Sequence, residues 1–248
     1  ATSSLTAADL EASGLPWSIA LATAAVMPGG SGTPEAPYQI ANLGNLYWLA
    51  ESSDRWSSSY IQTADIDASS TNSGEGWRPI GCWYNTSSEN SPFTGSYNGD
   101  NYSISGLYIN RPDTKYVGLF GYVGEGGMIS NVALNGVVVT GNNYVGGLVG
   151  RNEGEITGSC ATGSVTGSLH VGGLVGINYS EITNSYAGGM VSGTGINVGG
   201  LAGTNLFGTI TKSYATNTVT GTDNSVGGLV GLNSSGTITD SYASGAVT

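Results

Sequence analysis

A phrase of sequence recurs four times in the carboxyl-terminal part of this 248-residue chain. Each copy opens with Val-Gly-Gly-Leu and then carries, at matching places, an Asn, an Ile-Thr pair, a Ser-Tyr-Ala or Ser-Cys-Ala triplet and a Val followed by Thr or Ser. The copies begin at Val145, Val171, Val198 and Val226, which makes the steps 26, 27 and 28 residues, and a looser copy begins at Val117. Steps of this length predict a solenoid, propeller or array, in which no unit buries its apolar face alone.

The apolar positions of the repeat indicate which of these architectures forms. Each repeat has three short β-prone runs separated by glycine-rich corners, and none of the runs is long enough for a helical coil. We therefore predict an all-β fold, a parallel β-helix (β-solenoid) of about eight three-sided coils over residues 38–248, stacked about 4.8 Å apart. Three columns of like residues would then line the core: Leu148, Leu174, Leu201 and Leu229; Ile156, Ile182, Ile210 and Ile238; Val165, Val191, Val219 and Val247.

A fourth column is polar and consists of Asn152, Asn178, Asn205 and Asn233. An inward asparagine at a β-helix corner hydrogen-bonds the backbone of that corner and the asparagine of the next coil. The column is therefore predicted to be structural rather than a binding site. A further column, Tyr186, Tyr214 and Tyr242, predicts a stacked ladder whose direction, inward or outward, the alternation leaves open.

The repeat resembles the GLUG motif, a repeat of large secreted and surface bacterial proteins. The matching segments are Gly147–Gly150, Gly173–Gly176, Gly200–Gly203 and Gly228–Gly231, with the Asn, Ile, Ser-Tyr-Ala and Val positions that follow them. The preceding stretch resembles the leader of such repeats, in Gly32–Pro34 with Pro37–Ile40, Thr63–Asp67, Trp77–Gly81 and Phe93–Gly99. The resemblance implies a β-solenoid in an adhesin-like protein or in an accessory region of a secreted peptidase, and it brings no catalytic residue.

The chain divides into three parts on this pattern. Residues 1–31 are a short helical and apolar segment outside the repeats, and their apolar stretch Leu15–Met27 is too short to span a bilayer. We expect this segment to cap the solenoid or to take part in assembly. Residues 32–115 are predicted to form leader coils with a short helix over Asn42–Glu51, and residues 116–248 to form the repeats.

Composition limits the class of partner. The net charge is −11 and the chain has six Lys and Arg residues in all, so a nucleic-acid partner is not expected, because phosphates would not be neutralised. Glycine accounts for 42 residues, and abundant Ser, Thr and Asn are typical of an extracellular surface. An extracellular or cell-surface location is therefore predicted, with no membrane span.

Tryptophan and cysteine supply the candidate binding residues and the candidate cross-link. Trp48, Trp56, Trp77 and Trp83 are possible glycan contacts, because aromatic rings stack on sugars; the alternative is that bulky residues close the end of the solenoid. Cys82 and Cys160 are too few for a disulfide framework, and they form either one bridge from the leader to the first full coil or two separate thiols.

Catalytic and metal-binding patterns are weak. Asp65 and Asp67 lie on one face of a predicted strand, as a paired-carboxylate site would require, but in the GLUG leader this pair is part of the fold. The single histidine, His170, has no second histidine or cysteine near it in sequence for a zinc site. We expect no enzyme activity, no cofactor and no bound metal.

These observations favour a non-enzymatic extracellular structural protein, a β-solenoid that serves as an adhesin stalk or as the subunit of a head-to-tail surface filament. The filament expectation rests on a last repeat that reaches Thr248 without a capping segment, and on the apolar stretch at the other end of the chain. The alternative is a glycan-binding or accessory region of a secreted enzyme. The expected partners are other copies of the chain and, in the alternative, glycans or a host or cell surface.

Overall fold

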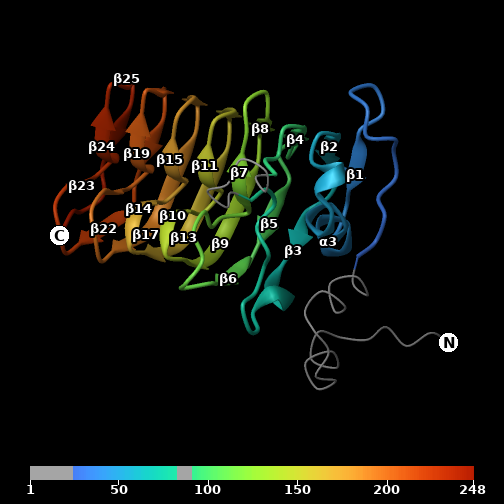
Figure 1. Ribbon diagram of the computed structural model, residues 1–248, viewed down its shortest axis with the longest axis horizontal. Coiled ribbons are helices and arrows are strands. Elements are labelled where there is room, and N and C mark those ends of the chain that lie inside the picture. The colour runs from blue at the N-terminus through green and yellow to red at the C-terminus, as the bar shows by residue number, and fades with distance from the viewer. Residues whose placement is uncertain (1–24, 83–90) are drawn as a thin grey trace.

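The computed structural model describes residues 25–82 and 91–248, which wind into an elongated parallel β-solenoid (Figure 1). The coils stack along the long axis, with the leader at one end and the last repeat at the other. Within the described residues, one short α-helix, α3 (Leu43–Glu51), and two 3-10 turns, η1 (Ser53–Arg55) and η2 (Ser69–Thr71), interrupt the strands of the leader. The named strands of the solenoid pair in parallel and form four sheets.

The two longest sheets run through both the leader and the repeats. The eight-stranded sheet has the order β1 (Tyr38–Ile40), β2 (Ser59–Gln62), β4 (Ser96–Asn98), β8 (Met128–Ser130), β12 (Glu155–Thr157), β16 (Glu181–Thr183), β20 (Thr209–Thr211) and β25 (Thr237–Thr239). The nine-stranded sheet has the order β26 (Tyr242–Ala243), β21 (Tyr214–Ala215), β17 (Tyr186–Gly193), β13 (Cys160–Gly167), β9 (Ala133–Thr140), β5 (Ser103–Ser105) and β3 (Ile66–Asp67), with β22 (Thr218–Gly221) paired to β17 and β6 (Tyr108–Asn110) paired to β9.

The two shorter sheets belong to the repeats. The five-stranded sheet has the order β24 (Val230–Ser234), β19 (Ala202–Leu206), β15 (Val175–Asn178), β11 (Val149–Asn152) and β7 (Phe120–Val123). The four-stranded sheet has the order β10 (Asn143–Gly146), β14 (Leu169–Gly172), β18 (Val198–Gly199) and β23 (Val226–Gly227).

The expected coil of three sides is therefore wrong, because each repeat contributes one strand to each of four sheets. The Val-Gly-Gly-Leu-Val-Gly phrase forms two strands rather than one, and its glycines let the second strand pack closely on a neighbouring coil. A Cβ at Gly150 in β11 would lie 2.5 Å from the carbonyl carbon of Tyr116 in the preceding coil, and one at Gly146 in β10 would lie 2.6 Å from the Leu174 oxygen of the following coil. A side chain at either position would force these backbones apart.

The number of regular turns is about five, not eight, since the five-stranded sheet contributes one strand to each. The leader adds strands to the eight- and nine-stranded sheets only, so its turns are incomplete. The fold is thus a mostly β, parallel β-solenoid of about five turns with one short helix in the described part of its amino-terminal region.

The predicted apolar columns are confirmed. The isoleucine column is in register from Ile156 through Ile182 and Ile210 to Ile238, with each residue paired to its equivalent in the next coil. Leu148, Leu174 and Leu201 are all fully buried, and the valine column is buried as far as Val219. Like residues stack on like residues at the strand spacing, so each coil supplies the apolar surface that covers its neighbour.

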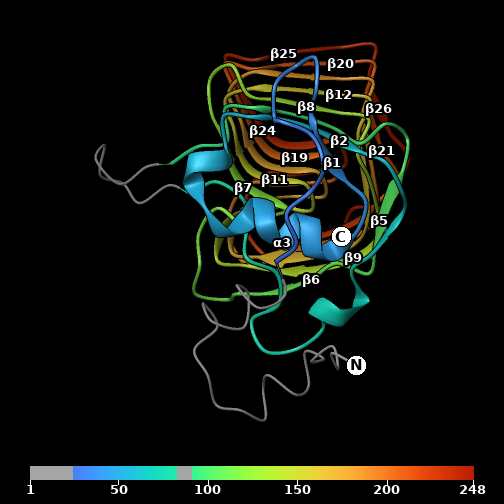
Figure 2. The ribbon, with the colours of Figure 1, turned by 90° about the vertical axis from the view of Figure 1, so that its right-hand side faces the viewer.

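The leader fills its coils differently. Helix α3 begins after Asn42, whose side chain accepts the Asn45 N–H, and it buries Leu46 and Leu49 in the core. Figure 2 shows the helix lying across the end of the solenoid, where it covers the first coil as the sequence predicts. Large aromatic side chains replace the narrow repeat columns here; the fully buried ones are Tyr60, Trp77, Phe93 and Tyr97.

The leader segment Trp77–Gly81 joins the solenoid through a single parallel bridge between Ile80 and Phe120. Most of the predicted capping or assembly segment, residues 1–24, lies outside the described residues. Of its remainder, Val26 is 52% exposed, and its backbone N–H donates to the Gly44 carbonyl at 2.9 Å.

Replacing Leu201 tests the core register. Leu201→Asp places an unpaired carboxylate at a fully buried position and should cost several kcal/mol, whereas Leu201→Val should cost about 1 kcal/mol. Thermal melts followed by circular dichroism should show a large decrease in Tm for the Asp variant and a small one for the Val variant. Equal melting of the Asp variant and the wild type would mean that Leu201 does not face the core.

Candidate functional site

The possible glycan contacts that the structure describes, Trp48, Trp56 and Trp77, differ in how deeply they are buried. Trp56 and Trp77 lie in the core at 4% and 1% exposure, and their indole N–H groups donate to backbone carbonyls. Both rings are therefore enclosed in the core of the leader, and neither presents a face to solvent. Trp48 is half-buried, with Tyr38 packed edge-on 5.0 Å away, and it stays a prediction. Trp83 lies outside the described residues.

The two cysteines are separate thiols in the structure. Cys82 is half-buried and forms a β-bridge with Ser91 in the leader, where it precedes the five-stranded sheet. Cys160 is buried at the start of β13 in the nine-stranded sheet and pairs with Tyr186 of the next coil. Of the two predicted alternatives, the structure has the unbridged one, with the two residues in different parts of the coil.

The paired carboxylates Asp65 and Asp67 are engaged locally. Asp65 accepts hydrogen bonds from the Ser103 N–H at 2.7 Å and from the Ser103 hydroxyl at 2.9 Å, and Asp67 accepts one from the Ser69 N–H at 2.8 Å. The hydrogen bonds from Ser103 lower the pKa of Asp65, and those from Ser69 lower the pKa of Asp67. Asp65 thus joins its corner to the following coil, whereas Asp67 closes the turn to Ser69 within its own coil.

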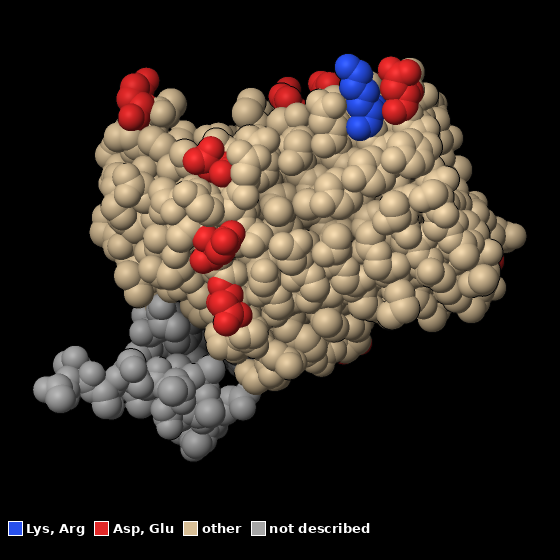
Figure 3. Space-filling model, turned by 180° about the vertical axis from the view of Figure 1, so that it is seen from behind, with Lys and Arg blue, Asp and Glu red and all other residues tan. Residues whose placement is uncertain are grey.

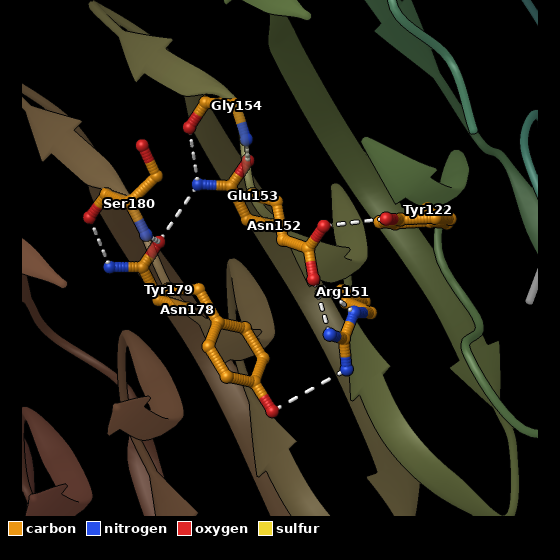
Figure 4. A network of polar contacts seen from close by, with 8 residues as sticks. All are labelled: Tyr122, Arg151, Asn152, Glu153, Gly154, Asn178, Tyr179 and Ser180. Atoms are coloured by element: carbon orange, nitrogen blue, oxygen red, sulfur yellow. Dashed lines mark hydrogen bonds and ion pairs between the residues drawn. The ribbon is translucent and has the colours of Figure 1, made fainter. Parts of the chain in front are cut away.

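The asparagine column forms a continuous hydrogen-bonded ladder, and Figure 4 shows its step from Asn152 to Asn178. Asn152, Asn178 and Asn205 are fully buried, and each donates its amide N–H to the Oδ1 atom of the next asparagine at 2.8 Å, ending at Asn233. Each amide also donates to a backbone carbonyl of its own corner, as Asn152 does to Gly154 at 2.9 Å. The predicted structural role is confirmed, because both N–H groups of each buried amide have a partner.

A second polar cluster in Figure 4 was not predicted from the sequence. The Arg151 guanidinium forms an ion pair with Glu153 and lies over the ring of Tyr179, 4.4 Å from its centroid. The hydroxyl of Tyr122 donates to the other Glu153 oxygen at 2.5 Å. Arg151 pairs with Tyr122 of the preceding coil in the five-stranded sheet, so the solenoid register brings these residues together. The sequence signal for this cluster is the spacing of about one repeat between Tyr122, Arg151 and Tyr179, which differ in residue type and so do not form a column of like residues.

Two aromatic ladders run along the outside of the solenoid. Tyr186, Tyr214 and Tyr242 stack at 4.9 and 5.2 Å between ring centroids, and because they are half-buried to exposed the predicted ladder faces outward. A second ladder of Tyr116, Tyr144 and His170 stacks at 4.6 and 4.7 Å. All three members of the second ladder have positive φ, which places them at the same corner of successive coils. The stacked rings cover one another's faces.

The surroundings of His170 favour its neutral form over the charged one. Its Nδ1 atom lies 3.2 Å from the Asn197 amide nitrogen, which can only donate, and 2.7 Å from the Thr204 hydroxyl. Nδ1 therefore accepts, and the ring proton belongs on Nε2. Burial lowers the pKa of His170 below its usual value. The histidine thus takes the place of an aromatic ring in a ladder and is not positioned by a carboxylate as a general base would be.

The described residues hold no group of three or more His, Cys, Asp and Glu side chains arranged to bind a metal ion. Within the same residues, no helix has the length and apolar character needed to cross a membrane. The dominant feature of the described part is therefore the set of ladders, in which polar and aromatic side chains are paired with their own equivalents.

Comparison with known proteins agrees with this arrangement. The model of the GLUG motif matches residues 141–166, 167–192, 194–220 and 222–248. This chain carries an array of four GLUG motifs. Each motif spans one coil of the solenoid, from the corner before the four-stranded sheet to the end of the strand in the nine-stranded sheet.

Two relatives each match a little over half of this chain. Halomucin of Haloquadratum walsbyi is 43% identical over 141 residues, which are 55% of this chain and 2% of halomucin. A protein of Evansella cellulosilytica named "Putative Gly-rich membrane protein" is 38% identical over 146 residues, which are 56% of this chain and 16% of that protein. The chain therefore spans only a small part of the length of these relatives.

A solved structure shows the same fold. The crystal structure titled "a putative immunoglobulin A1 protease" from Bacteroides ovatus superimposes with a TM-score of 0.66 over 88% of this chain and 69% of that one, at 22% sequence identity. At this identity the likeness concerns the fold alone.

The asparagine ladder can be tested with one charged replacement. In Asn178→Asp, the carboxyl group would face the Ser180 carbonyl and the Asn205 Oδ1 atom, both acceptors, so its pKa would rise in the folded state. Because the folded variant then binds the proton more tightly than the unfolded one, its stability falls as pH rises above the ordinary Asp value of about 4. Urea unfolding at neutral pH should show a loss of about 3 kcal/mol that shrinks in acid.

The matched control is Asn184→Asp, the same change at an exposed corner of the same coil, where the residue has a φ of 49° that Asp tolerates. This control should unfold within about 0.5 kcal/mol of the wild type. An Asn178→Asp protein as stable as the control at neutral pH would contradict the ladder.

The lowered pKa of His170 predicts a dependence of the folding stability on pH that is opposite in sign to that of Asn178→Asp. Its folded pKa is below its unfolded pKa, so the unfolded chain binds more protons and stability decreases as pH falls below about 6.5. Since the chain has one histidine, this loss should be measurable as a decrease in Tm between pH 7.5 and pH 5.5. His170→Asn places at this corner the residue type that the next coil has at Asn197, and it should remove most of the decrease in Tm. An unchanged pH profile in the variant would assign the effect to another group.

Proposed function

We propose that this chain is a non-enzymatic structural segment, a stiff β-solenoid stalk or spacer within a larger cell-surface or secreted protein. The carrying observation is the unbroken register of identical residues from coil to coil, in the apolar columns and in the asparagine ladder. A repeat array of this kind extends by adding coils without changing its cross-section. The relatives support the proposal, because the matching region makes up a small share of long proteins, one of them named as a membrane protein.

Stiffness follows from how the coils are joined. Each of the four repeats pairs with its neighbour in four sheets, and the ladders add side-chain contacts that bridge the same two coils. Bending the rod would stretch hydrogen bonds in at least one sheet and separate stacked rings. A solenoid whose coils are joined on each side is therefore stiff, and it keeps the protein regions at its two ends at a fixed separation.

The proposal includes head-to-tail association of copies. The last coil continues the inner columns, yet Leu229, Val230 and Ile238 are only partly buried and Val247 is 47% exposed, whereas their equivalents in earlier coils are buried. A further coil with the same register would cover them. Within a larger protein, following coils of the same chain would supply that cover; for separate copies of this chain, we propose an open, head-to-tail contact.

The glycan-binding alternative has less support. Two of the three described tryptophans that motivated it are buried, and the third is packed against Tyr38 and Arg55. It stays an alternative for Trp48.

Sedimentation velocity over a range of concentrations, with negative-stain electron microscopy of the same samples, tests the association. The wild type should sediment faster and form longer rods as its concentration rises, and Val247→Asp should stay monomeric because it places a carboxylate on the exposed end. The control Met190→Asp changes a side chain that is 60% exposed on the side of the rod, so it should behave like the wild type. Rods of one length at all concentrations would contradict head-to-tail association, and globular particles would contradict the stalk itself.

A further inference from the structure

The cations of this acidic chain are unevenly placed. On the face that Figure 3 shows, most of the surface is uncharged and the charged side chains are mainly carboxylates. Arg78, Arg111 and Lys115, three of only six Lys and Arg residues in the chain, line one hollow of about 120 Å³ in the leader. None of its eight described lining residues is Asp or Glu. A chain with a net charge of −11 thus has a local positive site.

The two walls of the hollow are segments that the backbone holds in place. The first wall, residues 78–82, is fixed to the following coil, where the Ile80 N–H donates to the Leu119 carbonyl at 3.0 Å. The bend at Gly81 has a φ of +79°, and a Cβ there would lie 2.2 Å from the Tyr122 oxygen, so glycine is required for this wall. The position of the Arg78 backbone is therefore set by the fold.

The second wall, residues 111–116, is fixed in the same way. The Arg111 N–H donates to the Thr140 carbonyl and the Tyr116 N–H to the Asn143 carbonyl, both at 2.9 Å. Tyr116 is buried and begins the Tyr116–Tyr144–His170 ladder, so the wall is continuous with the rigid repeats. A ligand would meet a preformed site and would not have to order the backbone around it.

The charges in the hollow are not balanced. Arg111 forms an ion pair with Glu75 at 2.8 Å, and its Nε–H donates to the Trp77 carbonyl at 3.0 Å, so its charge is largely satisfied. Burial lowers the pKa of Arg111, and nearby Arg78 lowers it further against the opposing effect of Glu75. Among the described residues, neither Arg78 nor Lys115 forms an ion pair, and both are exposed at the rim.

We propose that this hollow binds a single oxyanion group, a carboxylate or sulfate, presented either as a free ion or as the acid group of an acidic sugar. Its size suits one such group. The Arg78 guanidinium offers a planar pair of N–H donors and the Lys115 ammonium a point charge, which together suit an oxyanion. Polyanions are disfavoured, because the surrounding net negative charge repels every further acid group that they carry.

The test is isothermal titration calorimetry of the full chain at low ionic strength with sodium sulfate, sodium glucuronate and, as the uncharged reference, glucose. Sulfate and glucuronate should bind with a Kd in the low millimolar range and glucose should not. Arg78→Gln and Lys115→Gln should each weaken binding about tenfold by removing one charge-assisted contact. Added salt should weaken binding further, since both groups are exposed to screening.

The matched control is Lys212→Gln, which changes the net charge equally at an exposed corner of the repeats, and its affinity should equal that of the wild type. Tighter binding of glucuronate than of sulfate would support an acidic sugar, and equal binding would support recognition of the oxyanion alone. Binding that survives both rim variants, or that Lys212→Gln weakens as much, would overturn the proposal, as would no binding of either anion. The site is independent of the proposed stalk, because binding is measured by heat and association by sedimentation.

Discussion

In-register parallel pairing between successive coils is the constraint on which the rest of this structure depends. Each residue of a repeat lies one strand spacing, about 4.8 Å, from its equivalent in the next coil. A residue type that tolerates its own copy at that distance can form a column, and one that does not must change from repeat to repeat. Leucine, isoleucine and valine meet this condition by dispersion and burial, and they form the inner columns from Leu148, Ile156 and Val165 onward.

Asparagine meets the same condition by polarity. Its amide has an acceptor at one end and donors at the other, so a stack of parallel amides satisfies itself in one direction, and the second donor of each amide reaches a corner carbonyl. Serine is used similarly in the column of Ser159, Ser185 and Ser213, where each backbone N–H donates to the hydroxyl of the next serine at 3.1 Å. These polar columns specify the register, since a slip of one residue would leave buried donors unpaired.

Periodic features of the fold could be predicted from the sequence, whereas contacts between residues far apart in the chain could not. The columns, the asparagine ladder and the helix over Asn42–Glu51 follow from the periodicity of the sequence, which is visible in one dimension. The split of the Val-Gly-Gly-Leu phrase into two strands was missed, because close backbone contacts at Gly150 depend on a neighbouring coil. The hollow was missed for a similar reason, since Arg78 and Lys115 come from separate leader segments that only the fold brings together.

The same constraint explains where charges are found. A charge repeated in every coil would place like charges about 4.8 Å apart along the rod. Their repulsion is unfavourable, and most so where the charged groups are partly buried and water weakens it less. Glu155 pairs with Glu181 at a surface position of the eight-stranded sheet, and the column then changes to Thr209 and Thr237. Charged residues make up only 9% of the chain. A cluster of like charges therefore needs a region where the repeat is broken, and the leader, whose irregular turns hold Arg78, Arg111 and Lys115, is such a region.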